Sequence, residues 1–164
     1  MTRLAVYAGT FDPITLGHMD LIERGAEIFD NLILAVAADS QKTTLFSVEE
    51  RAEMAKEAVS GLDNVKVESF TGLLIDYARR KSARMLIRGL RAYSDFEYEF
   101  QMALTNRKLA AEIETVFMMP KEIHSYVSSS TVREVAGLGG DTSEFVPGFV
   151  EKKLRAKFAE NEVS

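Results

Sequence analysis

The stretch G-T-F-D-P-I-T-L-G-H, residues 9–18, decides the fold because it joins the first apolar run to the first helical pattern. The preceding run, residues 4–8, is short, apolar and ended by a glycine, which favours a buried strand. Apolar residues then recur at helical spacing over 22–29, so we expect a helix to begin near Gly17, with His18 in its first turn. Free N–H groups and the helix dipole attract anions at such an end. The stretch therefore predicts a phosphate-binding turn.

Composition limits the classes of protein that the chain can belong to. With 164 residues and 46% apolar content, residues 1–164 are expected to form a single domain with one core. The net charge of −5 gives no general attraction to nucleic acid or to anionic membranes. The absence of cysteine excludes disulfides and thiolate chemistry, and two histidines make a histidine-rich metal site unexpected. No signal-peptide layout or long apolar run is present, so a cytoplasmic location is expected.

Strand-like runs alternate with helical patterns along the chain. The apolar runs that predict strands are residues 4–8, 32–38, 65–70, 85–87 and 115–118. Between them, S-x-x-E capping boxes at Ser47 and Ser94 predict helices over 48–59 and 95–110, and Pro147 precedes a last helix. The alternation predicts an α/β fold, a single-domain, doubly wound, parallel five-stranded sheet of the Rossmann-like type. Ligands of such sheets bind at the carboxyl ends of the strands.

Two further loops carry polar chemistry. R-G-L-R, residues 88–91, follows the fourth predicted strand, and S-Y-V-S-S-S-T-V-R, residues 125–133, follows the fifth, with Thr131 and Glu134 as a possible capping box. In a parallel sheet, loops that follow strands emerge at one edge. The side chains that this predicts around one cleft, sufficient in charge for a nucleoside triphosphate, are His18, Lys42, Arg88, Arg91 and Arg133.

Each of these residues also has a structural interpretation. His18 could face the sheet, and Arg88 and Arg91 could pair with Asp95 and Glu99. The serines of the third loop could simply cap a helix. The hypothesis of a functional site depends on the joint placement of the three loops.

Motifs that the chain lacks exclude several classes of reaction. It contains neither G-x-x-x-x-G-K-[ST] nor G-x-G-x-x-G, and no G-x-S-x-G serine elbow. Once these classes are excluded, the reaction class that remains is group transfer at a phosphorus atom. An attacking phosphate has a second pKa of about 6 and arrives ionised at neutral pH, so that reaction needs no general base. Positioning and stabilisation of charge are then sufficient for catalysis.

Three segments carry a resemblance to a known family. Thr15-Leu16-Gly17-His18 matches the [T/H]-x-G-H motif of nucleotidyltransferases, and R-G-L-R-x-x-x-D-F-E-Y-E over 88–99 and S-S-S-T-V-R-E over 128–134 narrow the match. From first strand to last helix, the chain resembles the bacterial phosphopantetheine adenylyltransferase family. The resemblance implies transfer of AMP from ATP to 4′-phosphopantetheine, which gives dephospho-coenzyme A and pyrophosphate.

The resemblance also implies residue roles. It gives His18 the stabilisation of the pentacoordinate α-phosphorus transition state, with Thr10 beside it. The residues implied for binding 4′-phosphopantetheine are Thr10, Lys42, Leu74 and Arg88. Those implied for binding ATP are Thr10, Phe11, His18, Gly89, Leu90, Arg91, Glu99, His124, Ser125, Tyr126, Val127, Ser128, Ser129 and Ser130. At position 124 some members carry tryptophan, a departure that could change packing beside the adenine.

Further expectations concern the metal and the partners. Mg²⁺ is expected on the ATP phosphates, with no protein ligand, since no carboxylate cluster is evident. The resemblance suggests a homohexamer, with neither nucleic acid nor membrane as a partner. Two alternatives stay open: a nucleotidyltransferase of the same fold with another acceptor, such as nicotinate mononucleotide or glycerol 3-phosphate, and a noncatalytic adenine-nucleotide sensor.

Overall fold

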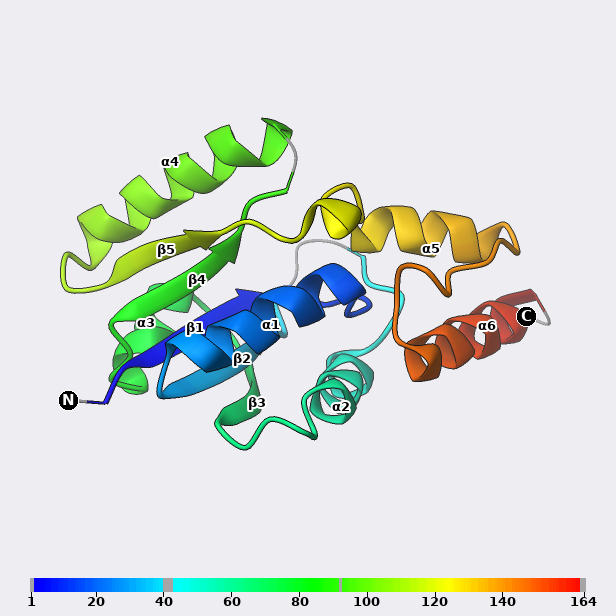
Figure 1. Cartoon of the computed structure of the whole chain (residues 1–164), viewed down its shortest axis with the longest axis horizontal. Coiled ribbons are helices and arrows are strands. Elements are labelled where there is room, and N and C mark those ends of the chain that lie inside the picture. Colours follow the sequence, from blue (N-terminus) through cyan, green and yellow to red (C-terminus); the bar gives the residue numbers. More distant parts are fainter. Residues whose placement is uncertain (1, 40–42, 92, 163–164) are drawn as a thin grey trace.

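The protein is built on one parallel β-sheet (Figure 1). The computed structural model describes residues 2–39, 43–91 and 93–162. The sheet has the order β3-β2-β1-β4-β5, and every neighbouring pair is parallel. The strands are β1 (Leu4–Gly9), β2 (Asn31–Ala37), β3 (Val65–Phe70), β4 (Met85–Gly89) and β5 (Glu114–Met118). The predicted fold class, a doubly wound five-stranded α/β sheet, is confirmed.

Helices cover both faces of the sheet. They are α1 (Leu16–Ile28), α2 (Val48–Ala58), α3 (Leu74–Arg80), α4 (Tyr93–Leu109), α5 (Ser129–Gly137) and α6 (Gly148–Glu162), with a 3₁₀ turn, η1 (Glu122–His124). Side chains of α1, α2, α5 and α6 pack with Tyr7 and Leu34 on one face, while α3 packs with Val6 and Ile33 on the other. Alternate residues of a strand thus enter two separate cores, as the period of two requires.

Local sequence sets several helix starts. Ser47 and Glu50 form the predicted capping box of α2, since the serine Oγ accepts from Glu50 N–H at 3.1 Å and Ser47 N–H donates to the glutamate at 2.8 Å. By contrast, α4 begins at Tyr93, so Ser94 lies inside its first turn and not before it. The short helix α3 has no side-chain cap, and its sequence pattern did not predict it.

One buried arginine holds the loop after β1. Arg51 of α2 is 2% exposed. Its guanidinium donates to the carbonyl oxygens of Thr10 at 2.7 Å, Ala37 at 2.8 Å and Phe46 at 3.2 Å. Burial lowers the pKa of Arg51, and the nearby charge of Asp12 opposes that shift. Arg51 therefore joins the β1 loop, the end of β2 and the entry to α2.

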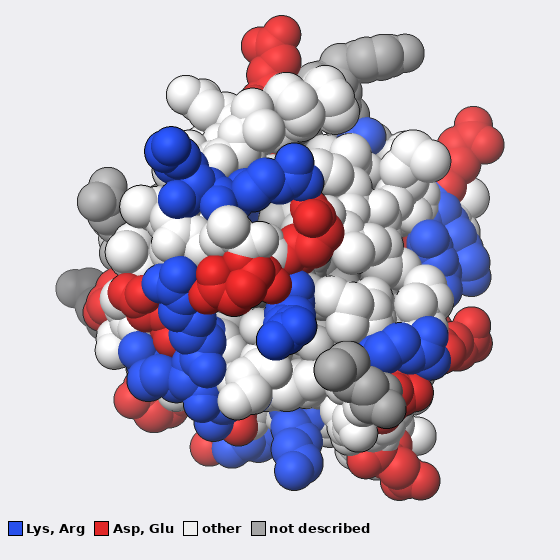
Figure 2. All heavy atoms as spheres, turned by 90° about the vertical axis from the view of Figure 1, so that its left-hand side faces the viewer, with Lys and Arg blue, Asp and Glu red and all other residues white. Residues whose placement is uncertain are grey.

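The amino ends of the strands form a face of mixed charge. Figure 2 shows this face, where basic and acidic side chains interleave. Ion pairs here include Arg3 with Asp30 at 3.1 Å and Arg79 with Glu112 at 2.6 Å. Within the described ranges, no helix combines the length and the apolar character that a membrane crossing needs.

We predict that Arg51→Met lowers the free energy of unfolding by about 3 kcal/mol, because buried carbonyl oxygens that lose their donor each cost ~1–3 kcal/mol. Urea unfolding measures this. The control is Arg155→Met, whose side chain is 70% exposed in a pair with Glu151 and whose loss should cost under about 1 kcal/mol. Equal losses in the two variants would contradict the structural role of Arg51.

Candidate active site

The candidate site lies where the strand order reverses. The chain builds β1, β2 and β3 outward and then returns to place β4 against the other side of β1. Tyr7 pairs with Ile87 across this junction, so the carboxyl ends of β1 and β4 lie side by side. Such a switch point is the ligand-binding crevice of open α/β sheets.

His18 caps the helix that faces this junction. Thr15 is the N-cap of α1, and its Oγ1 accepts from His18 N–H at 3.3 Å. In return Thr15 N–H donates to His18 Nδ1 at 3.0 Å. A nitrogen that accepts this bond carries no proton, so the imidazole proton lies on Nε2. The box fixes both the tautomer and the orientation of the ring.

His18 is also held neutral. Burial, followed by the charges of Arg91 and Arg88, lowers the pKa of His18 to about 3. The Phe11 ring meets the imidazole edge-on, with 4.9 Å between ring centroids. At neutral pH the residue is therefore an N–H donor without charge.

Arg88 lies in β4, not in the loop after it, because β4 extends to Gly89. Its guanidinium donates to the two carboxylate oxygens of Glu99 at 2.8 and 2.7 Å, and to Ala8 O at 2.9 Å. Burial opposes the charge, but the Glu99 hydrogen bonds outweigh it and raise the pKa of Arg88. Arg88 therefore stays charged, and three of its five guanidinium N–H groups serve the protein.

The third loop closes over the first two. Ser129 Oγ donates to Pro13 O at 2.8 Å in the first loop, and Arg91 of the second loop donates to Val127 O at 3.2 Å. Ser128 is the N-cap of α5 and accepts from Thr131 N–H at 3.1 Å. The suggested Thr131–Glu134 capping box is wrong, because Ser128, three residues before Thr131, already occupies the cap position. The structure thus brings the three predicted loops together.

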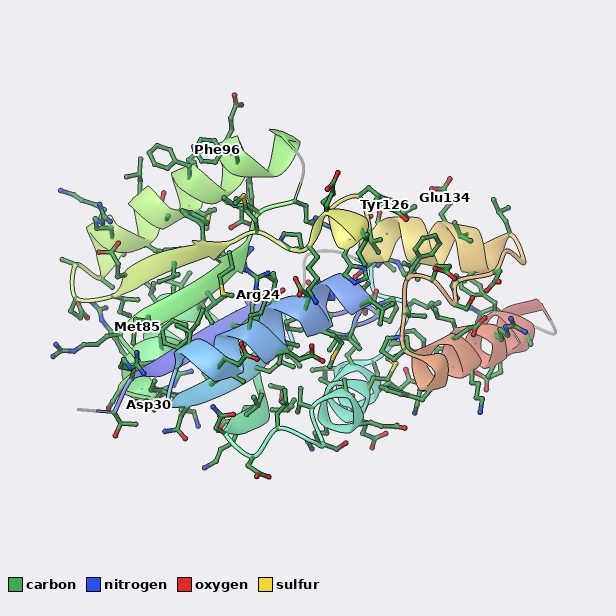
Figure 3. The ribbon with its side chains drawn as sticks, in the orientation of Figure 1. Arg24, Asp30, Met85, Phe96, Tyr126 and Glu134 are labelled. Carbon is green, nitrogen blue, oxygen red and sulfur yellow. The ribbon has the colours of Figure 1, made fainter. Side chains whose placement is uncertain are left out.

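An ion pair on α1 holds residues 119–121, the segment between β5 and the third loop. Arg24, labelled in Figure 3, donates to Asp20 at 3.0 Å and to Met119 O at 2.7 Å, just past β5. Asp20 also accepts from Lys121 N–H at 2.9 Å, and these contacts hold its pKa below the usual range despite its burial. The segment that leads to η1 is thereby tied to α1.

Carboxylates lie against at least two of the predicted cleft cations. Arg133 donates to Asp12 O at 2.5 Å and lies 3.6 Å from the Asp12 carboxylate. Arg88 is matched by Glu99, and His18 is neutral. Lys42 lies outside the described residues. Carboxylates thus offset two of the predicted charges, and one of these is the Arg88–Glu99 pairing that the sequence offered as an alternative. The match of the whole set to a nucleoside triphosphate stays a prediction.

Several predicted residues are placed by backbone and packing. A Cβ at Gly89 would stand 2.7 Å from Leu21 Cδ1, so a larger residue here would push the end of the Leu21 side chain aside. Leu90 N–H donates to Met118 O at 2.9 Å. Leu74 is the first residue of α3, half-buried against the core on the far face of the sheet.

The remaining predicted residues lie around η1 and the start of α5. His124 packs against Gly17, and its Nδ1 is the one buried side-chain polar atom without a partner among the described residues. Ser125 Oγ donates to Glu122 O at 2.8 Å. Tyr126 is exposed and meets Phe145 edge-on, and Ser130 is exposed.

The sequence interpretation missed Tyr7 and Arg51. Tyr7 lies within an apolar run that predicts only a strand, and Arg51 lies inside a charged helix. Periodicity carries no signal that separates either of them from ordinary core or surface residues.

The arrangement suits the binding of an anion and not general base catalysis. Neutral and cationic donors meet at the β1/β4 junction with two helix N-termini. Across the described ranges, no three histidine or carboxylate side chains gather closely enough to hold a metal ion.

Comparisons with known proteins agree with this geometry. The cytidylyltransferase-like family model matches residues 6–135. The phosphopantetheine adenylyltransferase of Desulforudis audaxviator is 55% identical over 156 residues, covering 95% of this chain and 96% of that protein. That of Methylococcus capsulatus is 55% identical over 159 residues, covering 97% and 98%.

Similarity of fold extends further. A Vibrio parahaemolyticus structure provisionally named nicotinate-nucleotide adenylyltransferase superposes with a TM-score of 0.71 at 17% identity, covering 94% of this chain and 99% of that one. At this identity the likeness concerns the fold.

We predict that His18 stays neutral, with its proton on Nε2, from pH 8 down to pH 5, because its pKa lies near 3. The lowered pKa means that the folded protein disfavours the imidazolium. Protonation of His18 therefore requires a pH well below the ordinary pKa of about 6.5. Nitrogen-15 NMR of labelled histidine measures the tautomer. A ring that titrates near pH 6.5 would contradict the prediction, and His124 provides the second signal for comparison.

Proposed function

The chain belongs to the phosphopantetheine adenylyltransferase family, and from this premise we propose how its cleft performs that family's reaction. The protein is a nucleotidyltransferase that transfers AMP from ATP to 4′-phosphopantetheine, giving dephospho-coenzyme A and pyrophosphate. The resemblance seen in the three motifs is confirmed by relatives that match 95–97% of the chain. The observation that carries the mechanism is the neutral, tautomer-fixed His18 at the β1/β4 junction.

The reaction is a direct in-line attack of the acceptor phosphate on the α-phosphorus of ATP. One P–O bond forms as the bond to pyrophosphate breaks, and the acceptor arrives ionised, so no base is required. His18 donates Nε2–H to a nonbridging oxygen of the pentacoordinate transition state, where negative charge develops. Thr10, whose carbonyl Arg51 holds, lies in the same loop and assists it.

The substrates enter from two sides. Thr10, Lys42, Leu74 and Arg88 bind the acceptor, with Leu74 at the carboxyl edge beyond β3. ATP lies against Phe11, the segment 89–91, Glu99 and the segment 124–130. Because Arg88 and Glu99 form an ion pair, they act as one unit that orients the Arg88 guanidinium.

Two other functions fit less well. A sensor that only binds ATP does not need a histidine with a fixed tautomer at the reacting centre. An adenylyltransferase with another acceptor shares the fold, but the relatives at 55% identity carry the phosphopantetheine name.

Mg²⁺ accompanies ATP in this proposal. The described residues offer no cluster of acidic ligands, so the ion is held by the β- and γ-phosphates. When bound, it offsets the charge of the departing pyrophosphate.

The protein works as a cytoplasmic homohexamer in this proposal. Support comes from α4, which exposes large apolar side chains at Phe96, Tyr98, Phe100, Met102, Leu104 and Leu109. Figure 3 shows Phe96 projecting from α4 away from β5, and its ring stacks on Phe100 at 5.7 Å. Exposed apolar area of this kind marks protein interfaces.

We predict that His18→Ala lowers kcat at least ~10²–10³-fold, the usual effect of losing one transition-state donor. Pyrophosphate release from MgATP and 4′-phosphopantetheine measures the loss. ATP affinity, measured by calorimetry, should stay close to that of the wild type. Near-normal turnover of the variant would show that His18 only caps α1. A wild-type protein that uses only another phosphate acceptor would contradict the proposed function.

We also predict that thorough chelation of divalent ions abolishes pyrophosphate release and that Mg²⁺ restores it, because the charge on the leaving group is otherwise uncompensated. The protein alone should keep its thermal unfolding midpoint under chelation, since the ion is held by ATP. Full activity in the chelator would rule out the Mg²⁺ requirement.

A further inference from the structure

Tyr7 places an aromatic side chain at the reacting end of β1. The residue is 5% exposed and pairs with Ile87 of β4. Its ring meets Phe11 edge-on at 5.4 Å between centroids and lies 6.5 Å from the His18 ring. Packing against β4 and the first loop therefore fixes where the phenol points.

The hydroxyl of Tyr7 has no hydrogen-bond partner among the residues that the structure describes. It lies 3.9 Å from the point where a Cβ would stand at Gly89, so it reaches the carboxyl end of β4. The other buried tyrosine of the two cores, Tyr77, bonds Glu68 at 2.7 Å. The Tyr7 hydroxyl is not among the fully enclosed polar atoms that lack a partner, so it borders the crevice, where a ligand can supply its hydrogen-bond partner.

The surroundings of the hydroxyl identify the class of that partner. Burial raises the pKa of Tyr7, although the charges of Arg88 and Arg91 oppose the shift, so the phenol is a donor throughout the working pH range. His18 supplies another neutral donor nearby. The Glu99 carboxylate nearby is engaged by Arg88, so the donors and cations around the hydroxyl suit a phosphate oxygen.

We propose that the Tyr7 hydroxyl donates a hydrogen bond to a phosphate oxygen of the nucleotide at the β1/β4 junction, which makes Tyr7 a further substrate-contacting residue. The inference rests on the proposed function for the identity of the nucleotide. It adds a second uncharged donor, rooted in a strand, to the one that His18 supplies from α1.

Tyr7→Phe tests this, because it removes the oxygen and keeps the packing. We expect kcat/KM for pyrophosphate release to fall about tenfold to a hundredfold, the range for a hydrogen bond to a charged group. MgATP should bind more weakly while adenosine binds as before. The thermal unfolding midpoint should stay the same or rise, since the hydroxyl has no partner in the free protein.

Tyr77→Phe is the matched control on the opposite face of the sheet. It should lower the unfolding midpoint, because Glu68 loses its donor, and change kcat/KM less than about twofold. Tyr7→Phe activity within twofold of the wild type, or adenosine binding weakened as much as MgATP binding, would overturn the inference. An inactive wild type would contradict the proposed function instead, and the comparison of MgATP with adenosine would still decide the role of Tyr7.

Discussion

The cleft depends on the buried guanidinium of Arg51. The loop after β1 must leave the sheet, turn, and present Thr10 and His18 to a ligand, and its backbone carbonyls need donors if they are to be buried. Arg51 supplies them for Thr10, Ala37 and Phe46 at once. Asp12 completes the arrangement by accepting from Leu45 and Phe46 N–H at 2.9 and 3.0 Å. The loop is thus held in place by backbone hydrogen bonds to a buried guanidinium and a buried carboxylate.

Within the cleft, too, buried cationic side chains are paired with carboxylates. Arg88 is matched by Glu99 and Arg133 by Asp12, so these arginines position backbone and neighbouring groups as much as they attract an anion. In the proposed function, directional N–H and O–H groups then contribute to recognition beside net charge. Such groups cost no reorganisation when charge develops in a transition state, which is the basis of electrostatic preorganisation.

The sequence predicted the features that local patterns encode. Five apolar runs located the five strands to within one or two residues, and the Ser47 capping box located α2, because burial and capping are local consequences of residue type. The convergence of the three loops followed from the parallel sheet. The sequence offered the pairing of Arg88 with Glu99 only as one interpretation, and it did not predict that Arg133 engages Asp12 or that Arg51 is buried. Those contacts join residues far apart in the chain, and no periodicity records them.

The capping boxes of α1 and α2, both in the described part of the chain, show how the cleft shapes its helix. At α2 the reciprocal partner is Glu50, a carboxylate that also accepts from Lys157 at 3.0 Å. At α1 the equivalent position carries His18, which accepts the same backbone N–H through Nδ1. A glutamate there would place a negative charge where phosphate must bind. The imidazole caps the helix without charge and keeps its second nitrogen as a donor, so one residue both starts the helix and faces the reaction.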